Sequence, residues 1–290
     1  MVEPVGFGAN PETAADNAFQ AIAAGDPAEV EARALGEFRS LRAALESRGI
    51  EVVAFAPDGT PPPDAVFPNN WFSTHPSGSW ILYPMMAPSR RRERARGIVE
   101  WLGERYGTPI DLTPEEARGR FLEGTGSLVI DEPSRVVYAS ISSRTDSELV
   151  QEWAARFGYR PVIFTARDRD GRVIYHTNVV LMLGTGYAIA CVTAMEPSEG
   201  RRRVLEELTR SGRTVVEIGL DQLHAFCANA LELEGTGGDR FLVMSERAWR
   251  ALTPEQKSVL EDIVEVVRAD LETIETYGGG SARCMLAELY

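Results

Sequence analysis

Apolar residues follow two patterns along this chain, a period near 3.6 residues and short continuous apolar runs. The 3.6-residue period predicts helices, and they cover residues 28–48, 91–106, 146–157, 200–211 and 253–277. Several end at a glycine, as in SRGI, RYGT, RFGY and RSGR, and glycine is a common helix stop. The apolar runs predict strands at residues 51–56, 79–84, 135–140, 178–183, 187–192, 214–219 and 241–246.

Polar residues stand at the head of successive strand-containing segments. They are Asn70, Glu123, Asn178, Asn229 and Cys284, separated by 53, 55, 51 and 55 residues, and a further step of 53 back along the chain reaches Asn17. Nearly equal spacings indicate an internal repeat. We therefore expect a single α/β domain over residues 1–290, built from about five ββαβ units. A ring of such units would bring the polar heads to one central site.

The clearest sequence similarity between units is LEGTG, which occurs at residues 122–126 and 233–237. Weaker relatives of the two surrounding segments are NNWFSTHPSGSWILYP and TNVVLMLGTGYAIAC. The alternative is that LEGTG merely recurs as a turn sequence, because pairs of glycines mark many hairpins.

The charge balance restricts the partners. Thirty basic and forty-three acidic residues give a net charge of −13, which argues against a nucleic-acid or anionic-membrane partner, since both need basic patches. The first twenty residues lack the basic and apolar parts of a signal peptide, and no apolar run approaches the ~20 residues that span a bilayer. Three scattered cysteines do not form a disulfide framework. We expect a cytoplasmic protein.

Cys284 is the candidate nucleophile. It follows three consecutive glycines and Arg283 in GGGSARCMLAE, where backbone approaches a ligand closely and a nearby cation favours the thiolate. A free cysteine is more often a small buried apolar residue, and that interpretation suits Cys191 in YAIACV and Cys227 in AFCANAL.

Two further polar residues at unit heads could act with a cysteine. A nucleophilic cysteine needs a base and proton donor, and His176 precedes a predicted strand, although a lone histidine there is more often a cap or surface residue. His75 lies in a turn-like sequence, and His224 is the second choice. Glu123 stands between apolar residues, where burial without a partner is costly; alternatively it faces a turn.

The motifs FPNNW, MAPSRRRE, LEGTG, SISSRTD, YHTN and GGGSARCMLAE occur in this order from Phe67 to the C-terminus. With them the chain resembles the guanidine-modifying (pentein) superfamily of arginine deiminases, dimethylarginine dimethylaminohydrolases and amidinotransferases. FPNNWFSTH and GGGSARCMLAE are most similar to the citrulline-utilisation hydrolases. The resemblance implies a five-bladed α/β propeller with a central active site and a hydrolase acting on carbon–nitrogen bonds.

The resemblance also implies roles for individual residues. The family's nucleophile falls on Cys284, its general acid/base on His176, and the glutamate that binds the planar head of the substrate on Glu123. The arginine that holds the substrate α-carboxylate falls on Arg144, and Arg90 is a second candidate for that anchor. The resemblance implies a small amino-acid substrate, and neither a cofactor nor a metal. A homo-oligomer stays open.

Two departures from the family bear on the substrate. Arginine deiminases carry aspartates where this chain has Asn70 and Asn178. A neutral amide does not balance a buried cation, but it offers a donor and an acceptor, which suits a ureido group. We therefore expect hydrolysis of citrulline to ornithine, ammonia and carbon dioxide through a carbamoyl group on Cys284. The alternatives are an arginine deiminase or dimethylaminohydrolase with another carboxylate such as Asp239, an amidinotransferase, and an inactive propeller that serves as a binding module.

Overall fold

The strands of this protein gather in four three-stranded sheets that share one topology. The computed structural model describes residues 1–21, 25–57 and 61–290. In each sheet the first two strands pair antiparallel and the third pairs parallel to the second. The sheets are β1 (Phe72–Thr74), β2 (Trp80–Leu82) and β3 (Ile110–Asp111); β4 (Val129–Asp131), β5 (Val136–Ser140) and β6 (Arg160–Phe164); β7 (Leu181–Leu183), β8 (Tyr187–Ala190) and β9 (Thr214–Glu217); and β10 (Leu231–Glu234), β11 (Arg240–Ser245) and β12 (Glu265–Ala269).

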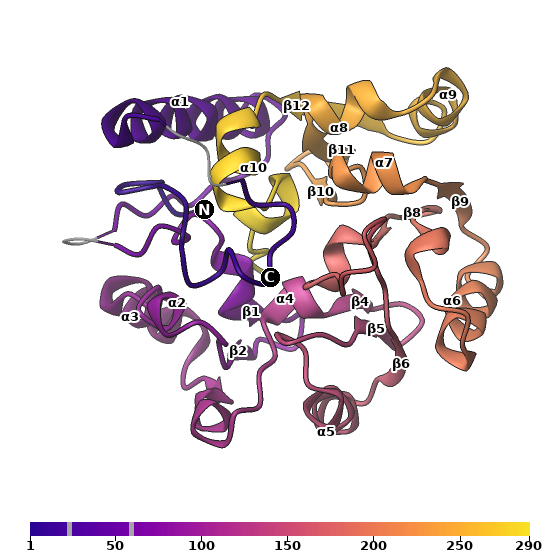
Figure 1. Ribbon diagram of the computed structural model, residues 1–290, viewed down its shortest axis with the longest axis horizontal. Coiled ribbons are helices and arrows are strands. Elements are labelled where there is room, and N and C mark those ends of the chain that lie inside the picture. Colours follow the sequence, from indigo (N-terminus) through magenta and orange to yellow (C-terminus); the bar gives the residue numbers. More distant parts are fainter. Residues whose placement is uncertain (22–24, 58–60) are drawn as a thin grey trace.

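A helix connects the second strand of each sheet to the third, because parallel neighbours need a crossover. These helices are α3 (Arg96–Tyr106), α5 (Ser147–Phe157), α6 (Glu199–Arg210) and α9 (Pro254–Glu261), and the same connections also contain α2 (Pro88–Arg91), η4 (Val192–Ala194) and α8 (Glu246–Ala251). After the third strands come η2 (Thr113–Arg118), α7 (Leu220–His224) and α10 (Glu272–Gly278). The longer helices lie at the rim and the strands lie further inward (Figure 1). The repeated ββαβ order therefore appears in the structure.

Local sequence sets the ends of these helices. The side chain of Asp146 caps α5 by accepting from the backbone N–H of Leu149, and Ser198 caps α6 in the same manner. The four glycines in SRGI, RYGT, RFGY and RSGR all adopt positive φ, between 68° and 78°, so they stop the helices as predicted.

The two ends of the chain lie next to each other near the centre (Figure 1). Val2 forms a parallel bridge with Phe55, and α1 (Pro27–Glu46) lies between them in the chain. This arrangement repeats the parallel step of the four sheets. The C-terminal segment packs against the first sheet, where Thr74 Oγ1 donates to the carbonyl oxygen of Glu288 and accepts from the N–H of Tyr290.

Two predicted helices are wrong in extent. Residues 253–277 form α9, β12 and α10 rather than one helix, because the β-branched run at 266–267 pairs parallel with β11 in the sheet. Residues 91–106 are interrupted between α2 and α3. The predicted strand at 51–56 contributes only the bridge at Phe55.

The two LEGTG segments have different structures. At residues 122–126 the segment begins α4 (Gly124–Ser127), with Glu123 at the position before the helix. At residues 233–237 it runs from the end of β10 into the hairpin that leads to β11. The turn interpretation therefore holds for the second copy, and the similarity between the copies does not reflect equivalent positions.

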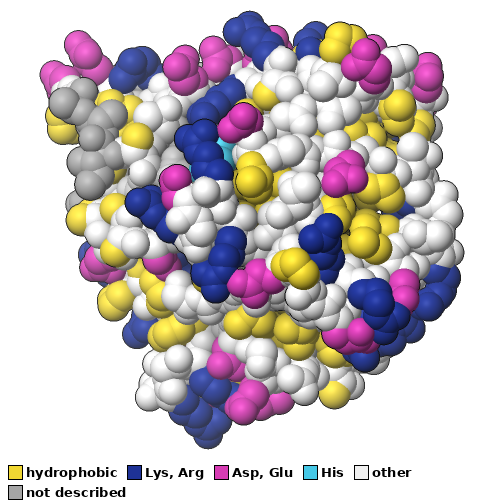
Figure 2. Space-filling view, turned by 45° about the vertical axis from the view of Figure 1, so that its right-hand side comes forward, with side chains coloured by type: hydrophobic (Ala, Val, Ile, Leu, Met, Phe, Trp, Pro, Cys, Tyr) yellow, Lys and Arg dark blue, Asp and Glu magenta, His cyan; other side chains and the backbone are white. Residues whose placement is uncertain are grey.

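Three short helical segments that precede sheets and one that follows the last sheet meet at the centre of the molecule. They are η1 (Pro68–Asn70), α4, η3 (Thr177–Val179) and η5 (Ala282–Met285). Acidic and basic side chains stand beside one another on the face in Figure 2. In the parts of the chain that the structure describes, no helix has the length and apolar character needed to cross a membrane.

Candidate active site

The polar residues at the unit heads converge on Cys284. Its Sγ lies 3.3 Å from Nδ2 of Asn229 and 3.8 Å from Nδ2 of Asn178. Nearby, Nε2 of His176 lies 2.9 Å from Oε2 of Glu123. All these residues are almost completely buried. Residues separated by 51 to 55 positions in the chain thus share one site, as the spacing predicted.

Glycines make this convergence sterically possible. A Cβ on Gly126 would lie 2.5 Å from Nδ2 of Asn70 and 2.7 Å from Nδ1 of His176. Gly279 has φ +63°, and a Cβ there would lie 2.4 Å from Nδ2 of Asn17. Only glycine therefore lets the loop before Cys284 and the start of α4 approach the site so closely.

Glu123 is ionised and His176 neutral at neutral pH. Burial opposes the charge on Glu123, but Arg144, His176 and Arg90 together outweigh it and lower its pKa to about 2. Burial lowers the pKa of His176, although Glu123 opposes this shift. The neutral imidazole then donates from Nε2 to the carboxylate. Its Nδ1 has no hydrogen-bond partner among the described residues and is left as an acceptor.

Arg90 is held by protein groups on several sides. Its Nε and Nη2 donate to the two carboxylate oxygens of Glu93 at 2.7 and 3.0 Å. Its Nη1 donates to Oδ1 of Asn70 at 2.9 Å and lies 3.6 Å from Oε2 of Glu123. In this structure the Arg90 guanidinium positions Asn70, in addition to lining the cavity as an expected carboxylate anchor.

Arg144 already holds a carboxylate. Its Nε and Nη2 donate to the two oxygens of Asp16 at 3.1 and 2.5 Å, which is the forked geometry typical of arginine with a carboxylate. The guanidinium also lies 4.9 Å above the ring of Tyr175. Asp16 thus engages the guanidinium that the family resemblance implies as the anchor of a substrate α-carboxylate.

Asp64 and Asn229 are residues of the site that were not among the predicted site residues. Asp64 is buried beside Arg90, accepts from Asn10 and Thr13 through Oδ2, and leaves Oδ1 without a partner among the described residues. Burial raises the pKa of Asp64. Asp64 lies outside the repeat spacing, so no sequence signal identified it. Asn229 does follow that spacing, which was the available signal.

The other cysteines and histidines lie elsewhere. Cys227 Sγ contacts the carbonyl oxygen of Ala248, and burial raises its pKa to about 12. Cys191 is buried in the core. His75 bonds to Ser73, and His224 stacks on Phe19. None of the four lines the cavity around Cys284.

That cavity is small. It is lined by Cys284, His176, Asn70, Arg90, Arg144 and Asp64, and by residues of the N-terminal segment and the glycine loop. The space open to the centres of water-sized spheres is ≈ 10 Å³, about enough for one water molecule. Entry of an amino acid therefore requires the surrounding segments to move.

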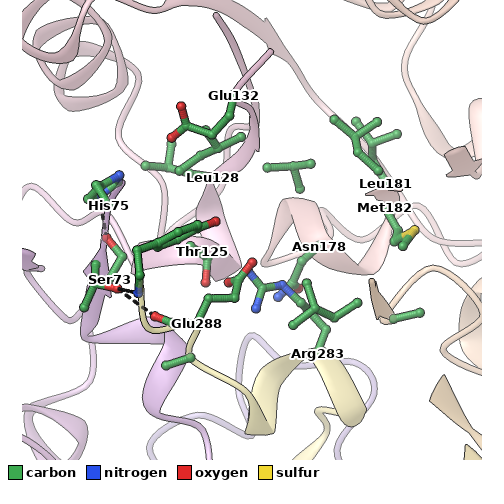
Figure 3. Close-up of a pocket in the computed structure, with 18 of the residues that line it drawn as sticks. Ser73, His75, Thr125, Leu128, Glu132, Asn178, Leu181, Met182, Arg283 and Glu288 are labelled. Carbon is green, nitrogen blue, oxygen red and sulfur yellow. Dashed lines mark hydrogen bonds and ion pairs between the residues drawn. The ribbon is translucent and has the colours of Figure 1, made fainter. Parts of the chain in front are cut away.

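A second cavity, of ≈ 100 Å³ by the same measure, includes Asn178 in its lining. Arg283, His75, Thr125 and Glu288 also line it (Figure 3). The guanidinium of Arg283 donates to Glu288 at 2.8 Å and to the carbonyl oxygen of Leu286. Arg283 therefore forms its hydrogen bonds with the C-terminal segment, while its charge still opposes the rise that burial causes in the pKa of Cys284.

Solved structures share this fold at low sequence identity. Arginine dihydrolase ArgZ, from the ornithine-ammonia cycle in cyanobacteria, matches with a TM-score of 0.76 and 20% identity over 98% of this chain and 39% of its own. The N-terminal domain of ArgZ, as a cysteine-to-serine mutant bound to substrate, matches with a TM-score of 0.76 and 19% identity. This match covers 98% of the present chain and 95% of the ArgZ domain. A dimethylarginine dimethylaminohydrolase variant, solved as an adduct with S-methyl-L-thiocitrulline, matches with a TM-score of 0.63 and 19% sequence identity, and the match covers 88% of each chain.

The chain thus spans about two fifths of full-length ArgZ. No curated protein matches its sequence. A family-model match over most of the chain defines its class, the pentein guanidine-modifying hydrolases, and the buried cysteine, histidine and glutamate are consistent with it. The family model for N,N-dimethylarginine dimethylhydrolase, eukaryotic, matches residues 3–290. The chain belongs to this family.

Proposed function

We propose that this protein hydrolyses the ureido group of citrulline to ornithine, ammonia and carbon dioxide, with Cys284 as nucleophile. The observation that carries the proposal is the orientation of the Asn70 amide. Arginine has no acceptor atom, so the contact with Arg90 Nη1 identifies the atom it meets as Oδ1. The other end of the amide, Nδ2, is buried, has no partner among the described residues and belongs to a cavity-lining residue.

An unpartnered donor suits a ureido group and not a guanidinium. A ureido carbonyl oxygen accepts hydrogen bonds, whereas every nitrogen edge of a guanidinium donates them. Leaving a buried donor unsatisfied costs about 1–3 kcal/mol, so a substrate with an acceptor at this place gains selectivity. With a guanidinium, Nδ2 would face another donor.

The mechanism starts from attack of the Cys284 thiolate on the ureido carbon. The C–S bond forms while the carbonyl π electrons move to the oxygen, and Nδ2 of Asn70 is placed to stabilise that oxyanion. The C–N bond to the leaving amine then breaks as the His176 imidazolium, which has taken the thiol proton of Cys284, gives that proton to the amine. His176 next accepts a proton from water, which attacks the S-carbamoyl group and releases Cys284. The carbamate formed breaks down to an amine and carbon dioxide.

The ends of the cavity suit an α-amino acid. Arg144 would bind the α-carboxylate once Asp16 withdraws, in the same forked geometry. The unpartnered oxygen of Asp64 would accept from the α-ammonium group, which lies next to the carboxylate in every amino acid. Glu123 would accept from the ureido N–H groups.

A second candidate is hydrolysis of a guanidino group, as in arginine or a methylated arginine. The family match supports it, and so does the ionised Glu123 within the site, since a carboxylate attracts a guanidinium. Asp239, the compensating carboxylate considered for an arginine-acting enzyme, does not line the cavity.

The direct test measures ammonia release from citrulline, arginine, methylarginines and agmatine. We expect citrulline to give the highest kcat/KM, and Cys284→Ser to lower it by at least ~10³-fold. Cys191→Ser and Cys227→Ser serve as controls and should retain turnover. Preferential turnover of a guanidino compound would reject citrulline as the substrate and support the second candidate. Full activity of Cys284→Ser would reject both candidates, since each uses Cys284 as the nucleophile.

We further infer that the ring has five units, the fifth built from both ends of the chain, and that the protein works in the cytoplasm. The Val2–Phe55 bridge with α1 as its crossover supports the fifth unit. The three free cysteines support a reducing compartment. A disulfide between two of these cysteines in the isolated protein would contradict the second inference.

A further inference from the structure

The side chain of Asn229 touches the reacting sulfur, although no role follows for it from the proposed reaction. Asn229 is fully buried between β9 and β10 and heads the fourth unit. Its Nδ2 lies 3.3 Å from Sγ of Cys284, closer than the 3.8 Å of Asn178 Nδ2. It is thus the nearer of the two amides that face the sulfur.

The backbone fixes which end of the Asn229 amide faces which group. The N–H of Ser281 can only donate, and it meets Oδ1 of Asn229 at 3.2 Å. The opposite end, Nδ2, meets the carbonyl oxygen of Asn178 at 3.3 Å, which can only accept. If the amide were flipped, Nδ2 would face the N–H of Ser281, donor against donor, and Oδ1 would face the carbonyl oxygen of Asn178, acceptor against acceptor. The end of the amide near the sulfur is therefore the donor end, and its two hydrogens are shared among Sγ of Cys284 and the carbonyl oxygen and Oδ1 of Asn178.

Asn229 can contact both protonation states of Cys284, but not equally. The neutral thiol donates to Oδ1 at 3.4 Å, whereas the thiolate accepts from Nδ2. A thiol is a weak donor, and hydrogen bonds to charged groups are stronger than those between neutral ones. The Asn229 side chain therefore stabilises the thiolate of Cys284 more than its neutral thiol.

We propose that Asn229 is a thiolate-stabilising residue of this hydrolase, whose Nδ2–H holds the Cys284 nucleophile in its charged form. The proposal rests on the proposed function only for the identity of the nucleophile. It concerns the ionisation of the Cys284 thiol, which takes place before a substrate binds. Asn178, held through its Oδ1 by the same Nδ2 at 3.2 Å, supplies a second and more distant donor.

Other groups around the sulfur lower the pKa of Cys284 less than Asn229 does; they include the backbone of Ser281 and the charge of Arg283. Burial raises the pKa of Cys284, so the thiolate needs compensation inside the protein. The Tyr175 hydroxyl donates to the carbonyl oxygen of Gly279, and Arg283 is engaged with Glu288. Glu275 accepts a hydrogen bond from Ser281 Oγ at 2.6 Å, and it is Ser281 that bonds to Asn229. His176, Glu123, Asp64, Arg90 and Arg144 are the remaining charged or titratable groups of the site.

The test measures the rate of Cys284 alkylation by iodoacetamide against pH, without substrate, in a Cys191→Ser/Cys227→Ser background. Asn229→Asp keeps the acceptor for Ser281 and removes the donor; Asn229→Ser shortens the side chain. We expect both to raise the midpoint of the alkylation profile by about one pH unit or more, a ~10-fold smaller thiolate fraction at neutral pH. Asn69→Ser, a change at a buried asparagine that bonds Thr125 rather than sulfur, is the control and should leave the midpoint in place.

A second measurement needs no substitution at Asn229. In the labelled protein, the side-chain amide resonances of Asn229 should titrate with the same midpoint as Cys284, and Cys284→Ser should abolish this titration. Unshifted alkylation midpoints in folded Asn229 variants, or amide resonances that do not follow the thiol, would overturn the proposal. Because neither measurement uses citrulline, a failure of the proposed substrate would leave these results unaffected.

Discussion

The Asn70 side-chain oxygen accepts a hydrogen bond from Nη1 of Arg90 at 2.9 Å, and this contact decides which end of the amide faces the cavity. An aspartate at the same place would keep one oxygen on Arg90 and present the other to the substrate. The exchange of one atom, nitrogen for oxygen, thus turns a donor into a charged acceptor at the point where ureido and guanidino groups differ.

Substrate preference should follow this atom. Asn70→Asp/Asn178→Asp should lose citrulline affinity, since two acceptors would then face each other, and should gain affinity for arginine through charge attraction. We expect a change in relative affinity of ~10-fold or more, about 1.4 kcal/mol. Titration calorimetry in a Cys284→Ser background measures binding without turnover. An unaltered preference for citrulline in the doubly substituted protein would show that these amides do not select the substrate.

Much of the site followed from the sequence because the repeat is regular. The spacing of Asn70, Glu123, Asn178, Asn229 and Cys284 places one residue per unit near a common centre, and the structure has them there. The amide orientations could not be predicted, because they depend on Arg90 and on the N–H of Ser281. Asp16 and Asp64 lie in irregular segments outside the repeat, so periodicity carried no information about them.

The fold was predictable in its order and less so in its boundaries. Glycines after Arg48, Tyr106 and Phe157 marked helix ends through a backbone conformation that glycine adopts readily. Residues 253–277 were misassigned because their apolar spacing also fits a helix, and only pairing with β11 selects a strand at β12. The spacing of apolar residues within a segment does not show whether that segment pairs with a strand elsewhere in the chain.

Loss of the imidazole should stop the reaction without preventing binding. His176→Ala should abolish turnover and leave no carbamoyl adduct on Cys284, because the leaving amine lacks its proton donor before the adduct can form. Intact-protein mass spectrometry after mixing with citrulline checks for the adduct, and calorimetry detects binding. His224→Ala is the control, since His224 stacks on Phe19 outside the cavity. An inactive His224→Ala with an active His176→Ala would contradict the placement of the acid/base.

A methyl group at Gly126 should impair catalysis. Its carbon would lie 2.5 Å from Asn70 Nδ2 and 2.7 Å from His176 Nδ1, so both side chains must shift. Misplacement by about 1 Å can cost ~10²-fold in rate, and we expect Gly126→Ala to lower kcat by that order. Gly36→Ala, in an exposed part of α1 with no atom within 4 Å of the new carbon, should retain kcat and stabilise the protein by about 0.5–1 kcal/mol. Equal kcat values for the two variants would refute the steric argument.

Removing the Asp16 carboxylate should ease substrate binding. In this structure Asp16 engages Arg144, so in the proposed function the α-carboxylate of citrulline would have to displace it. Asp16→Asn keeps the shape and removes the charge, and we expect KM for citrulline to fall several-fold while kcat changes little. Asp26→Asn, which alters the exposed cap of α1, is the control. A raised KM for Asp16→Asn would mean that Asp16 assists binding instead of competing with it.

The pH dependence of turnover should differ from that of thiol reactivity. Burial raises the pKa of Cys284 and lowers that of His176, so between these two values the pair holds one proton, mostly on sulfur. A fixed minor fraction carries it on the imidazole as the reactive thiolate–imidazolium form. Consequently kcat/KM should be flat over this interval. As pH falls through the lowered His176 pKa, a second proton should remove activity.

On the alkaline side the two measurements should move in opposite directions. As pH rises through the raised Cys284 pKa, the pair loses its last proton, so the thiolate persists while the proton donor for the leaving amine is gone. Alkylation by iodoacetamide, which requires only the thiolate, should therefore increase over the range where kcat/KM declines. Stopped-flow alkylation and steady-state ammonia release in the same buffers give both profiles. Parallel rises in alkylation and turnover would show that deprotonation of Cys284 alone limits the reaction, and that His176 is not the proton donor.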